Sequence, residues 1–339
     1  MTVTARDVAA KAGVSVSTVS RALARPELVS PITQARIATI AQDLGYAPNP
    51  VARSLSVGRT YNLGLVVPDL ENPFFSAVAK GVQSYARMLG YTTFIADTDE
   101  NAAVEVELVK HLAGQADGVL LCSPRVDEDD ILALSAITPL VVLNRPVPSI
   151  PSVSLDHADG MRQALRHLSA LGHRVIAYAG GPPASWSGRM RRDCVLRALA
   201  DDPVMEGVDL GHFPPVHHGG VAAADLALAS GATAVIAHND LMAIGLIQRL
   251  GLRDVRVPER MSVVGVDDIP QARLVSPPLT TVSAALHQLG RTAVDVILNP
   301  TPAPVEKLMP VDLIVRASTA EAPPEPGAAS RIRRLVTTS

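Results

Sequence analysis

Cysteine is scarce in this chain of 339 residues, and its apolar runs are short. Cys122 and Cys194 lie far apart without Cys-x-x-Cys or Cys/His spacing, which excludes a disulfide framework and a zinc site of the usual pattern. We expect both to be buried packing residues. No apolar run reaches the roughly 18 residues that a membrane helix needs. Arg6, Asp7 and Lys11 stand where a signal peptide has its apolar stretch, so we expect a cytoplasmic protein.

Aromatic residues make up only 3% of the chain and charged residues 19%, whereas apolar residues make up 47%. This composition is typical of a globular protein and does not fit a disordered chain or a coiled coil. The length suits a small head followed by a larger body of one or two lobes. The low aromatic content also argues against a binding site built from many stacked rings.

Positive charge is concentrated at the N-terminus. Residues 1–60 contain seven Lys and Arg against three Asp and Glu, a net charge of +4. The whole chain carries −3, which leaves −7 for the remaining 279 residues. This distribution indicates that residues 1–60 contact the phosphates of a nucleic acid, and it gives the acidic body no electrostatic reason to bind one.

The first sixty residues contain two short segments of helical periodicity separated by a tight turn. Thr4 is placed to cap a first helix over residues 5–11, and the turn Ala12-Gly13-Val14-Ser15 lets a second helix leave at a steep angle. In the second helix Val19 and Leu23 are four residues apart and face inward. This pattern predicts a helix-turn-helix.

The outward face of the second helix has the residue types that read DNA. Arg21 can donate two hydrogen bonds to a guanine edge, and Val16 can pack against a thymine methyl group. Small hydroxyl side chains beside them can bind phosphate oxygens. A solvated helix surface is the alternative interpretation. The predicted DNA-contacting residues of this part are Thr4, Ser15, Val16, Ser17, Thr18, Ser20 and Arg21.

A third helix and a break follow. Ser30-Pro31 is an N-cap with proline at the first helical position, and the apolar pattern continues to Gly45, which closes a three-helix core. Pro48-Asn49-Pro50 then stops the helix. Residues 51–57 could form only about two turns, too short to be stable alone in water. Something else must order them.

Seven motifs in this chain resemble, in order, those of the lactose and galactose repressor (LacI/GalR) family, over about residues 3–319. They are DVAAKAGVSVSTVSRAL, LGYAPNPVARSL, NPFF, LGHRVIA, SVVGVDD, PPLTTV and VRAST. The resemblance implies a hinge that folds on the operator, where Leu55 from two subunits wedges into a minor-groove base step and kinks the duplex. It also places Asn49, Ala52 and Arg53 beside the DNA.

The body alternates apolar strands with amphipathic helices, which predicts parallel sheets. A second unit begins near Asp156, so we expect two doubly wound lobes resembling the periplasmic sugar-binding fold, with the ligand site outside the carboxyl ends of the strands. The predicted strands are residues 63–67, 92–96, 118–122, 140–143, 175–179, 234–237 and 262–266.

Polar residues just past strand ends are the candidate effector-binding residues. By position these are Asp69, the pair Asn239 and Asp240, and the pair Asp267 and Asp268. The resemblance further implies that Phe74 or Phe75 stacks on a flat ring, Arg191 donates to the effector, Asn239 binds it and Asp267 accepts from a hydroxyl. The phenylalanines could instead be core residues. Helix capping or turn formation is the alternative for Asp156, Asp240 and Asp268.

Three positions depart from the family pattern. Cys194 stands where relatives have a glycine, Ala284 where several carry glutamine, and Val266 where an aromatic residue is frequent. A side chain at the glycine position could shift Arg191. We therefore expect an unusual pocket.

No catalytic set, metal site or cofactor motif emerges. Gly180-Gly181-Pro182-Pro183 lacks the backbone donors and the lysine of a phosphate loop, and His217-His218 lacks further metal ligands. Ser187-Gly188 is not part of a nucleophile elbow. An enzyme on this fold would need such a set.

These observations predict an all-α helix-turn-helix head on an α/β body of two parallel-sheet lobes. The expected units are the head (1–47), the hinge (48–60), the effector-binding and dimerisation body (61–319) and a flexible tail (320–339). We expect a homodimeric repressor of a pseudo-palindromic DNA operator, controlled by a small molecule that the family resemblance suggests is a sugar. A solute-binding protein for uptake is the alternative, and the direction of the response to ligand stays open.

Overall fold

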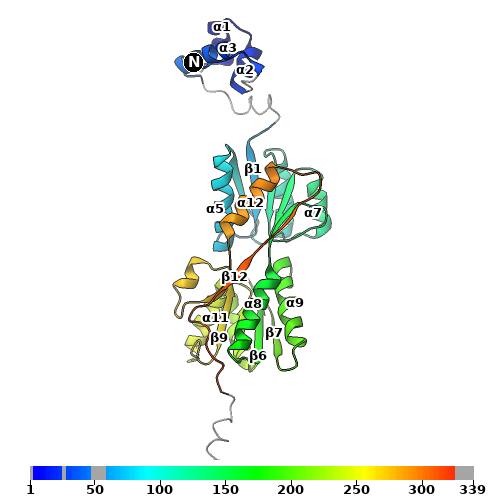
Figure 1. The fold of residues 1–339 in the computed structure, drawn as a ribbon, viewed down its shortest axis with the longest axis vertical. Coiled ribbons are helices and arrows are strands. Elements are labelled where there is room, and N and C mark those ends of the chain that lie inside the picture. The colour runs from blue at the N-terminus through cyan, green and yellow to red at the C-terminus, as the bar shows by residue number, and fades with distance from the viewer. Residues whose placement is uncertain (1–2, 25–27, 47–58, 325–339) are drawn as a thin grey trace, which may run out of the picture.

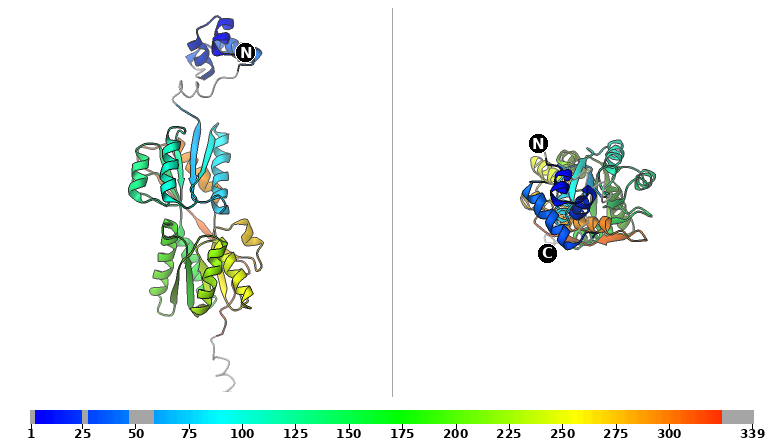
Figure 2. Two further views of the ribbon diagram at one scale, coloured as in Figure 1. Left: turned by 180° about the vertical axis from the view of Figure 1, so that it is seen from behind. Right: turned by 90° about the horizontal axis from the view of Figure 1, so that it is seen from above.

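A computed structural model describes residues 3–24, 28–46 and 59–324. The predicted DNA contacts Asn49, Ala52, Arg53 and Leu55 lie outside the described residues. Figures 1 and 2 show a small helical head and two lobes stacked along the long axis of the molecule. Within the described ranges, no helix is long and apolar enough to cross a membrane.

The head consists of α1 (Ala5–Ala12), α2 (Val16–Ala24) and α3 (Pro31–Asp43). Its core contains Val8 and Val19, both fully buried, and Ile37 from α3. Leu23 packs against this core, as predicted. Ile32 is an exception to the helical pattern, because it points into solvent with 85% of its surface exposed.

Lobe one contains a fully parallel six-stranded sheet in the order β11-β5-β4-β3-β1-β2. The strands are β1 (Asn62–Val67), β2 (Thr92–Asp97), β3 (Val119–Cys122), β4 (Leu140–Leu143), β5 (Ser152–Leu155) and β11 (Glu306–Met309). Helices α5 (Pro73–Met88) and α12 (Leu286–Leu298) cover one face, and α6 (Ala102–Ala113) and α7 (Glu128–Ser135) cover the other. Buried on both faces, the central strands read as continuous apolar runs.

Lobe two repeats the arrangement, with strand order β12-β10-β9-β8-β6-β7 and β12 antiparallel to β10. Its strands are β6 (Val175–Gly180), β7 (Glu206–His212), β8 (Ala234–Ala237), β9 (Ser262–Val266), β10 (Thr280–Ala284) and β12 (Val311–Ile314). Helices α8 (His157–Ala170) and α9 (Trp186–Ala200) pack on one face, and α10 (His217–Ala229) and α11 (Asp240–Leu252) on the other. A short 3-10 helix, η2 (Pro270–Arg273), follows β9.

The chain passes between the lobes three times, from β5 to α8, from β10 to α12 and from β11 to β12. The second passage takes α12 and β11 back to lobe one, and the third returns the chain to β12 of lobe two. Figure 1 shows α12 in lobe one, although it follows most of lobe two in the sequence. Three short connections form a natural hinge, because they permit rotation of the lobes while keeping them side by side.

Residues just beyond 319 are part of lobe two, although we expected the flexible tail to begin at residue 320. The Ala322 N–H donates to Leu171 O (2.8 Å), and the Ala320 carbonyl lies 3.1 Å from Nε2 of the fully buried His173. The ordered body therefore continues past its expected end, because this segment completes hydrogen bonds at the start of β6.

Candidate functional site

The outward face of α2 is an exposed surface of small polar side chains around one arginine. Val16 is 44% exposed, and Ser17, Ser20 and Arg21 also face solvent, whereas Thr18 is half-buried. The predicted recognition surface is thus open. A major groove admits such a helix with its N-terminal residues against the base edges.

The turn before α2 is built by glycine geometry and by capping. Gly13 has φ +64°, a left-handed conformation that glycine adopts without steric cost, and Val14 N–H donates to Ala9 O (3.1 Å). Ser15 caps α2, because its Oγ accepts from Thr18 N–H (3.1 Å). The Thr4 hydroxyl, predicted as a DNA contact, donates to Asp7 Oδ2 (2.8 Å). Hydrogen bonds from the Thr4 backbone and side chain lower the Asp7 pKa.

A cavity between the lobes lies at the carboxyl ends of the parallel strands, where the sheet topology predicts a ligand site. It has a polar compartment with about 30 Å³ of open space and an adjoining apolar compartment with about 10 Å³. The polar compartment is lined by Asn72, Phe74, Phe75, Glu100, Ser123, Arg125, Asn144, Ser185, Ser187, Arg191, Pro215, His238, Asn239 and Asp267. Because ligand pockets typically measure roughly 300–1,000 Å³, a ligand enters only if the lobes separate or side chains move.

Phe74 and Phe75 open helix α5 and line the cavity, and Phe74 reaches both compartments. Asn72 caps the helix, with its Oδ1 accepting from Phe74 N–H (3.0 Å). The two rings form an edge-to-face pair 5.1 Å apart and are almost fully buried. They therefore belong to the core and to the cavity wall, which combines the two interpretations that the sequence left open.

Arg191 is a buried cation in the cavity wall. It is 5% exposed, its Nε has no hydrogen-bond partner, and one of its terminal nitrogens lies 3.3 Å from Nδ1 of His238. Burial and the charge of Arg191 lower the pKa of His157 and His238 well below the usual value, so both imidazoles are neutral near pH 7. A buried guanidinium with an unused donor is ready to bind an acceptor group of a ligand.

Asp267 supplies the complementary acceptor. It follows β9 directly and has φ +116°, a strained conformation for a non-glycine residue of the kind that clusters at functional sites. Burial raises the pKa of its carboxyl group to about 7, although the charge of Arg191 opposes this shift. Near neutral pH the group can therefore accept or donate a hydrogen bond.

Asn239 lines the cavity as predicted, but its amide also builds the fold. Its Oδ1 accepts from Met242 N–H (3.0 Å) and caps α11, and its Nδ2 donates to Pro215 O (2.7 Å). Asp69 is a correction, because it does not line the cavity. Its Oδ1 accepts from Glu71 N–H (2.7 Å) and stabilises the turn after β1.

The capping alternative is confirmed for Asp156, whereas the carboxylates of Asp240 and Asp268 bind other partners. Asp156 caps α8 by accepting from Asp159 N–H (2.8 Å). Asp240 is fully buried and accepts from the hydroxyl of Thr281 and from a backbone N–H, and burial raises its pKa well above the usual value. Asp268 forms ion pairs with two arginines. None of the three lines the cavity.

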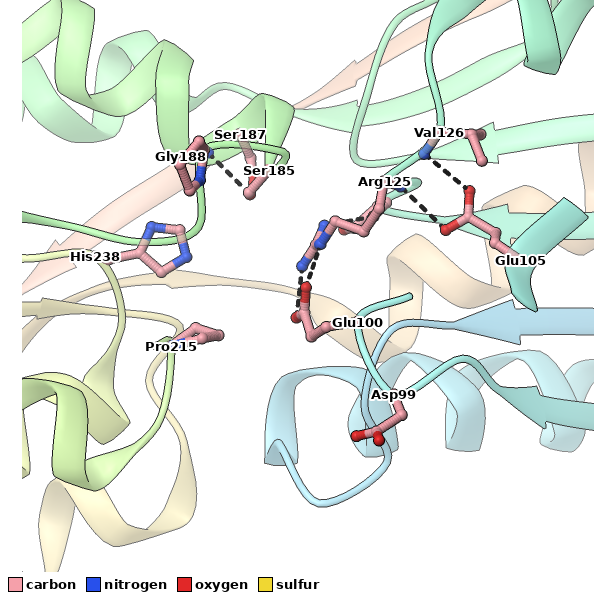
Figure 3. A network of polar contacts seen from close by, with 12 residues as sticks. Asp99, Glu100, Glu105, Arg125, Val126, Ser185, Ser187, Gly188, Pro215 and His238 are labelled. Carbon is pink, nitrogen blue, oxygen red and sulfur yellow. Dashed lines mark hydrogen bonds and ion pairs between the residues drawn. The ribbon is translucent and has the colours of Figure 1, made fainter. Parts of the chain in front are cut away.

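The most prominent feature that sequence reasoning missed is the ion pair of Glu100 and Arg125, both from lobe one (Figure 3). The guanidinium also donates to Ser123 O (2.6 Å) and is directed into the gap between the lobes, toward His238. Glu100 has φ +58°, and its neighbour Asp99 has φ +51°, so two consecutive strained residues carry this carboxylate. The buried Glu105 accepts from Arg125 N–H (3.0 Å) and fixes the loop from the other side.

Asn144 and His157 join the lobes beside this pair. His157 Nε2 and Asn144 Oδ1 are 2.8 Å apart, and the amide oxygen can only accept, so the neutral imidazole carries its hydrogen on Nε2. The Asn144 Nδ2 donates to Ser123 Oγ (3.0 Å). This chain of hydrogen bonds connects the ends of β3 and β4 in lobe one with the start of α8 in lobe two.

Two of the three unusual positions are at the cavity. Val266 and Ala284 line its apolar compartment, whereas Cys194 is half-buried on α9 one turn beyond Met190. Arg191 nevertheless lines the cavity, so the cysteine does not displace it. Among the described residues, no group of three or more His, Cys, Asp or Glu side chains is placed to hold a metal ion.

A helix-turn-helix head joined to a two-lobed body with a cavity between the lobes defines a ligand-responsive transcription regulator. Residues 4–49 match the model of bacterial regulatory proteins of the lacI family, and residues 165–319 match the periplasmic binding protein-like domain. The chain belongs to the lacI family.

The chain is similar to several named repressors. The HTH-type transcriptional repressor PurR of Photobacterium profundum is 33% identical over 305 residues, which cover 87% of this chain and 91% of PurR. The repressor CytR of Escherichia coli K12 is 30% identical over 331 residues, which make up 94% of this chain and 97% of CytR. The Lac repressor dimer bound to operator and an anti-inducer superimposes with a TM-score of 0.83, at 29% identity, covering 94% of this chain and all of that one.

Proposed function

We propose that this protein represses transcription as a homodimer on a pseudo-palindromic operator, and that a small polyhydroxylated effector held between the lobes sets its operator affinity. The cavity that both lobes line carries this proposal. Because its free space is small, occupancy by a ligand must move the lobes or the side chains that line the cavity, and in this proposal the lobes respond. A ligand shifts the equilibrium only by its difference in affinity for the two arrangements, and this difference decides whether it releases or strengthens operator binding.

The cavity chemistry favours hydroxyl groups on a ring with an apolar face. Arg191 offers a free donor, Asp267 offers an acceptor, and Phe74 offers an apolar wall. A sugar or sugar derivative presents alternating donors and acceptors around such a ring. The structure of the related regulator CelR holds cellobiose, and a lacI-family regulator of Enterococcus faecium holds ribose. We assign no catalytic role to the cavity.

Dimerisation supplies the DNA affinity that one head lacks. The α2 surface around Arg21 offers few base contacts, and two heads on a symmetric site double them. Residues 48–60 serve as the hinge in this proposal, with Leu55 as the wedge and Asn49, Ala52 and Arg53 beside the DNA. A solute-binding protein, the alternative, needs no such head.

The proposal is tested by operator binding at varied effector concentration. Operator fragments are selected from genomic DNA and labelled, and anisotropy is measured for the wild type, Arg191→Ala and the surface control Arg197→Ala. An effector changes wild-type and control affinity by tenfold or more and leaves Arg191→Ala unresponsive, while all three bind the operator alike without effector. Equal responses in all three contradict the cavity assignment, and recovery of the effector in altered chemical form shows that the cavity is catalytic.

A further inference from the structure

A groove of about 570 Å³ adjoins the effector cavity and is lined by the only tryptophan of the chain. Trp186, from the first turn of α9 in lobe two, faces a proline-rich loop of lobe one across it. The groove residues are Pro146, Val147, Pro148, Ser149, Ile150, Trp186, Pro304 and Glu306. This space is far larger than the open space within the cavity.

The groove and the cavity are connected by consecutive residues on both lobes. In lobe two, Ser185 and Ser187 line the cavity, and Trp186 between them lines the groove. In lobe one, Asn144 lines the cavity, and the loop from Pro146 onward lines the groove. The groove and the cavity are therefore neighbours that share the same two chain segments.

Trp186 occupies the boundary between the two spaces. Its ring centroid lies 6.3 Å from that of His157, which lines the apolar compartment of the cavity. The tryptophan is nevertheless only half-buried, so part of its ring remains open. A half-buried indole beside a polar cavity presents a flat apolar face on which a sugar or aryl ring can stack.

We infer that the groove is an outer subsite for a second ring of the effector, linked through a glycosidic oxygen to the ring held between Arg191 and Asp267. Trp186 stacks on the second ring, the proline rings form the opposite apolar wall, and the Glu306 carboxylate accepts from its hydroxyls. This inference rests on the proposed function, because the inner ring must bind first in the cavity. It assigns glycosides of two rings, rather than monosaccharides, as the preferred effector class.

The loop opposite Trp186 is rigid enough to serve as a wall. Asn144 and Ser149 have φ +62° and +65°, and a short antiparallel bridge joins Val147 to Ile150. Arg145 fastens the base of the loop by donating to Val126 O (2.6 Å). A preformed wall reduces the ordering that ligand binding must otherwise produce.

The test uses full-length protein and a panel of methyl glycosides, the matching disaccharides and the matching phenyl glycosides. Affinity is measured by calorimetry, and tryptophan fluorescence is recorded in parallel because Trp186 is the only source of it. The variants are Trp186→Ala, Trp186→Phe and Leu252→Ala, the last as an exposed apolar control on lobe two. Circular dichroism confirms that each variant is folded.

We expect a two-ring glycoside to bind the wild type at least tenfold more tightly than its one-ring counterpart and to change the tryptophan emission. Trp186→Ala removes this advantage while changing one-ring affinity by less than twofold, and Trp186→Phe and Leu252→Ala retain it. Disaccharides and phenyl glycosides distinguish a sugar from an aryl group as the outer ring.

Three outcomes overturn the inference. If one-ring glycosides bind in an Arg191-dependent manner and a second ring adds nothing, the outer subsite is wrong and the proposed function stands. If Trp186→Ala weakens one-ring and two-ring ligands equally, Trp186 only supports the cavity. If no glycoside binds or alters operator affinity, the carbohydrate effector itself is refuted, and the subsite with it.

Discussion

Replacing Asp267 by Asn should remove a pH dependence from the stability of lobe two. Asparagine has the shape of the neutral acid but cannot ionise. In the folded protein burial raises the pKa of Asp267 to about 7, whereas the ordinary value is 3.8. Between these two pH values the folded state binds more protons than the unfolded state, so the wild type loses stability as pH rises and loses no more above the folded pKa.

The magnitude follows from the size of the shift. A difference of about three pKa units corresponds to about 4 kcal/mol between pH 4 and pH 8. Asp267 keeps partial contact with solvent through the cavity, which screens the charge, so we expect about half of this, ~2 kcal/mol. Asp267→Asn should thus match the wild type near pH 4 and exceed its unfolding free energy by this amount at pH 8.

Urea unfolding followed by tryptophan fluorescence measures this directly, because Trp186 lies in the same lobe as Asp267. His157 and His238 face the same cavity, but they are present in both proteins and cancel in the comparison. Effector affinity provides a second readout, since hydroxyl binding by the carboxylate strengthens as pH rises through 7 in the wild type alone. A stability difference that stays constant from pH 4 to pH 8 would refute the titration of Asp267.

Three further predictions follow from the head, the ion pair and the packing of lobe one. Arg21→Ala should weaken operator binding by about 1–3 kcal/mol and relax base preference at one position per half-site, as measured by selection from random sequences. Arg125→Met leaves Glu100 half-exposed without its partner and should lower the unfolding free energy by ~2 kcal/mol in urea titrations, a loss that Glu100→Gln should partly reproduce. Gly290→Ala places a methyl group 2.7 Å from Val82 N and should lower the melting temperature with a cost of about 1–3 kcal/mol, whereas Gly251→Ala, with open space around it, should not.

The fold was largely predictable because its central strands are continuous apolar runs between helical segments. Five strands of the structure were not predicted, namely β5, β7, β10, β11 and β12. β11 has the sequence EKLM and is mostly exposed. β12 forms by pairing with β10, from which α12 and β11 separate it in the sequence. The return of α12 to lobe one depends on close contact with α5 at Gly81 and Gly290, which is a long-range effect that no local periodicity reports.

The site was predicted in part. The strand-end argument selected Asn239 and Asp267, the family resemblance added Phe74, Phe75 and Arg191, and the structure brings all five to one cavity. The strand-end argument that selected Asp69 failed there because a local turn takes up its carboxylate.

The same strand-end argument would have found three residues that were missed. Ser123, Asn144 and His238 each follow a predicted strand directly, and all three line the cavity. Arg125 and Glu100 carried no such signal, because their pairing joins two loops from neighbouring parts of lobe one. Positions after strand ends are therefore good candidates as a group, while the loop geometry decides which of them reach the ligand.

The central claim is that the head reads a symmetric DNA site under the control of the cavity. The most direct measurement is selection of genomic fragments by the purified protein at moderate salt, with and without a small-molecule extract of the cells, for the wild type and Arg21→Ala. The account predicts an inverted repeat that the wild type recovers, that the extract enriches or depletes, and that Arg21→Ala recovers poorly. Recovery of no common sequence under either condition, or equal recovery by Arg21→Ala, would contradict it.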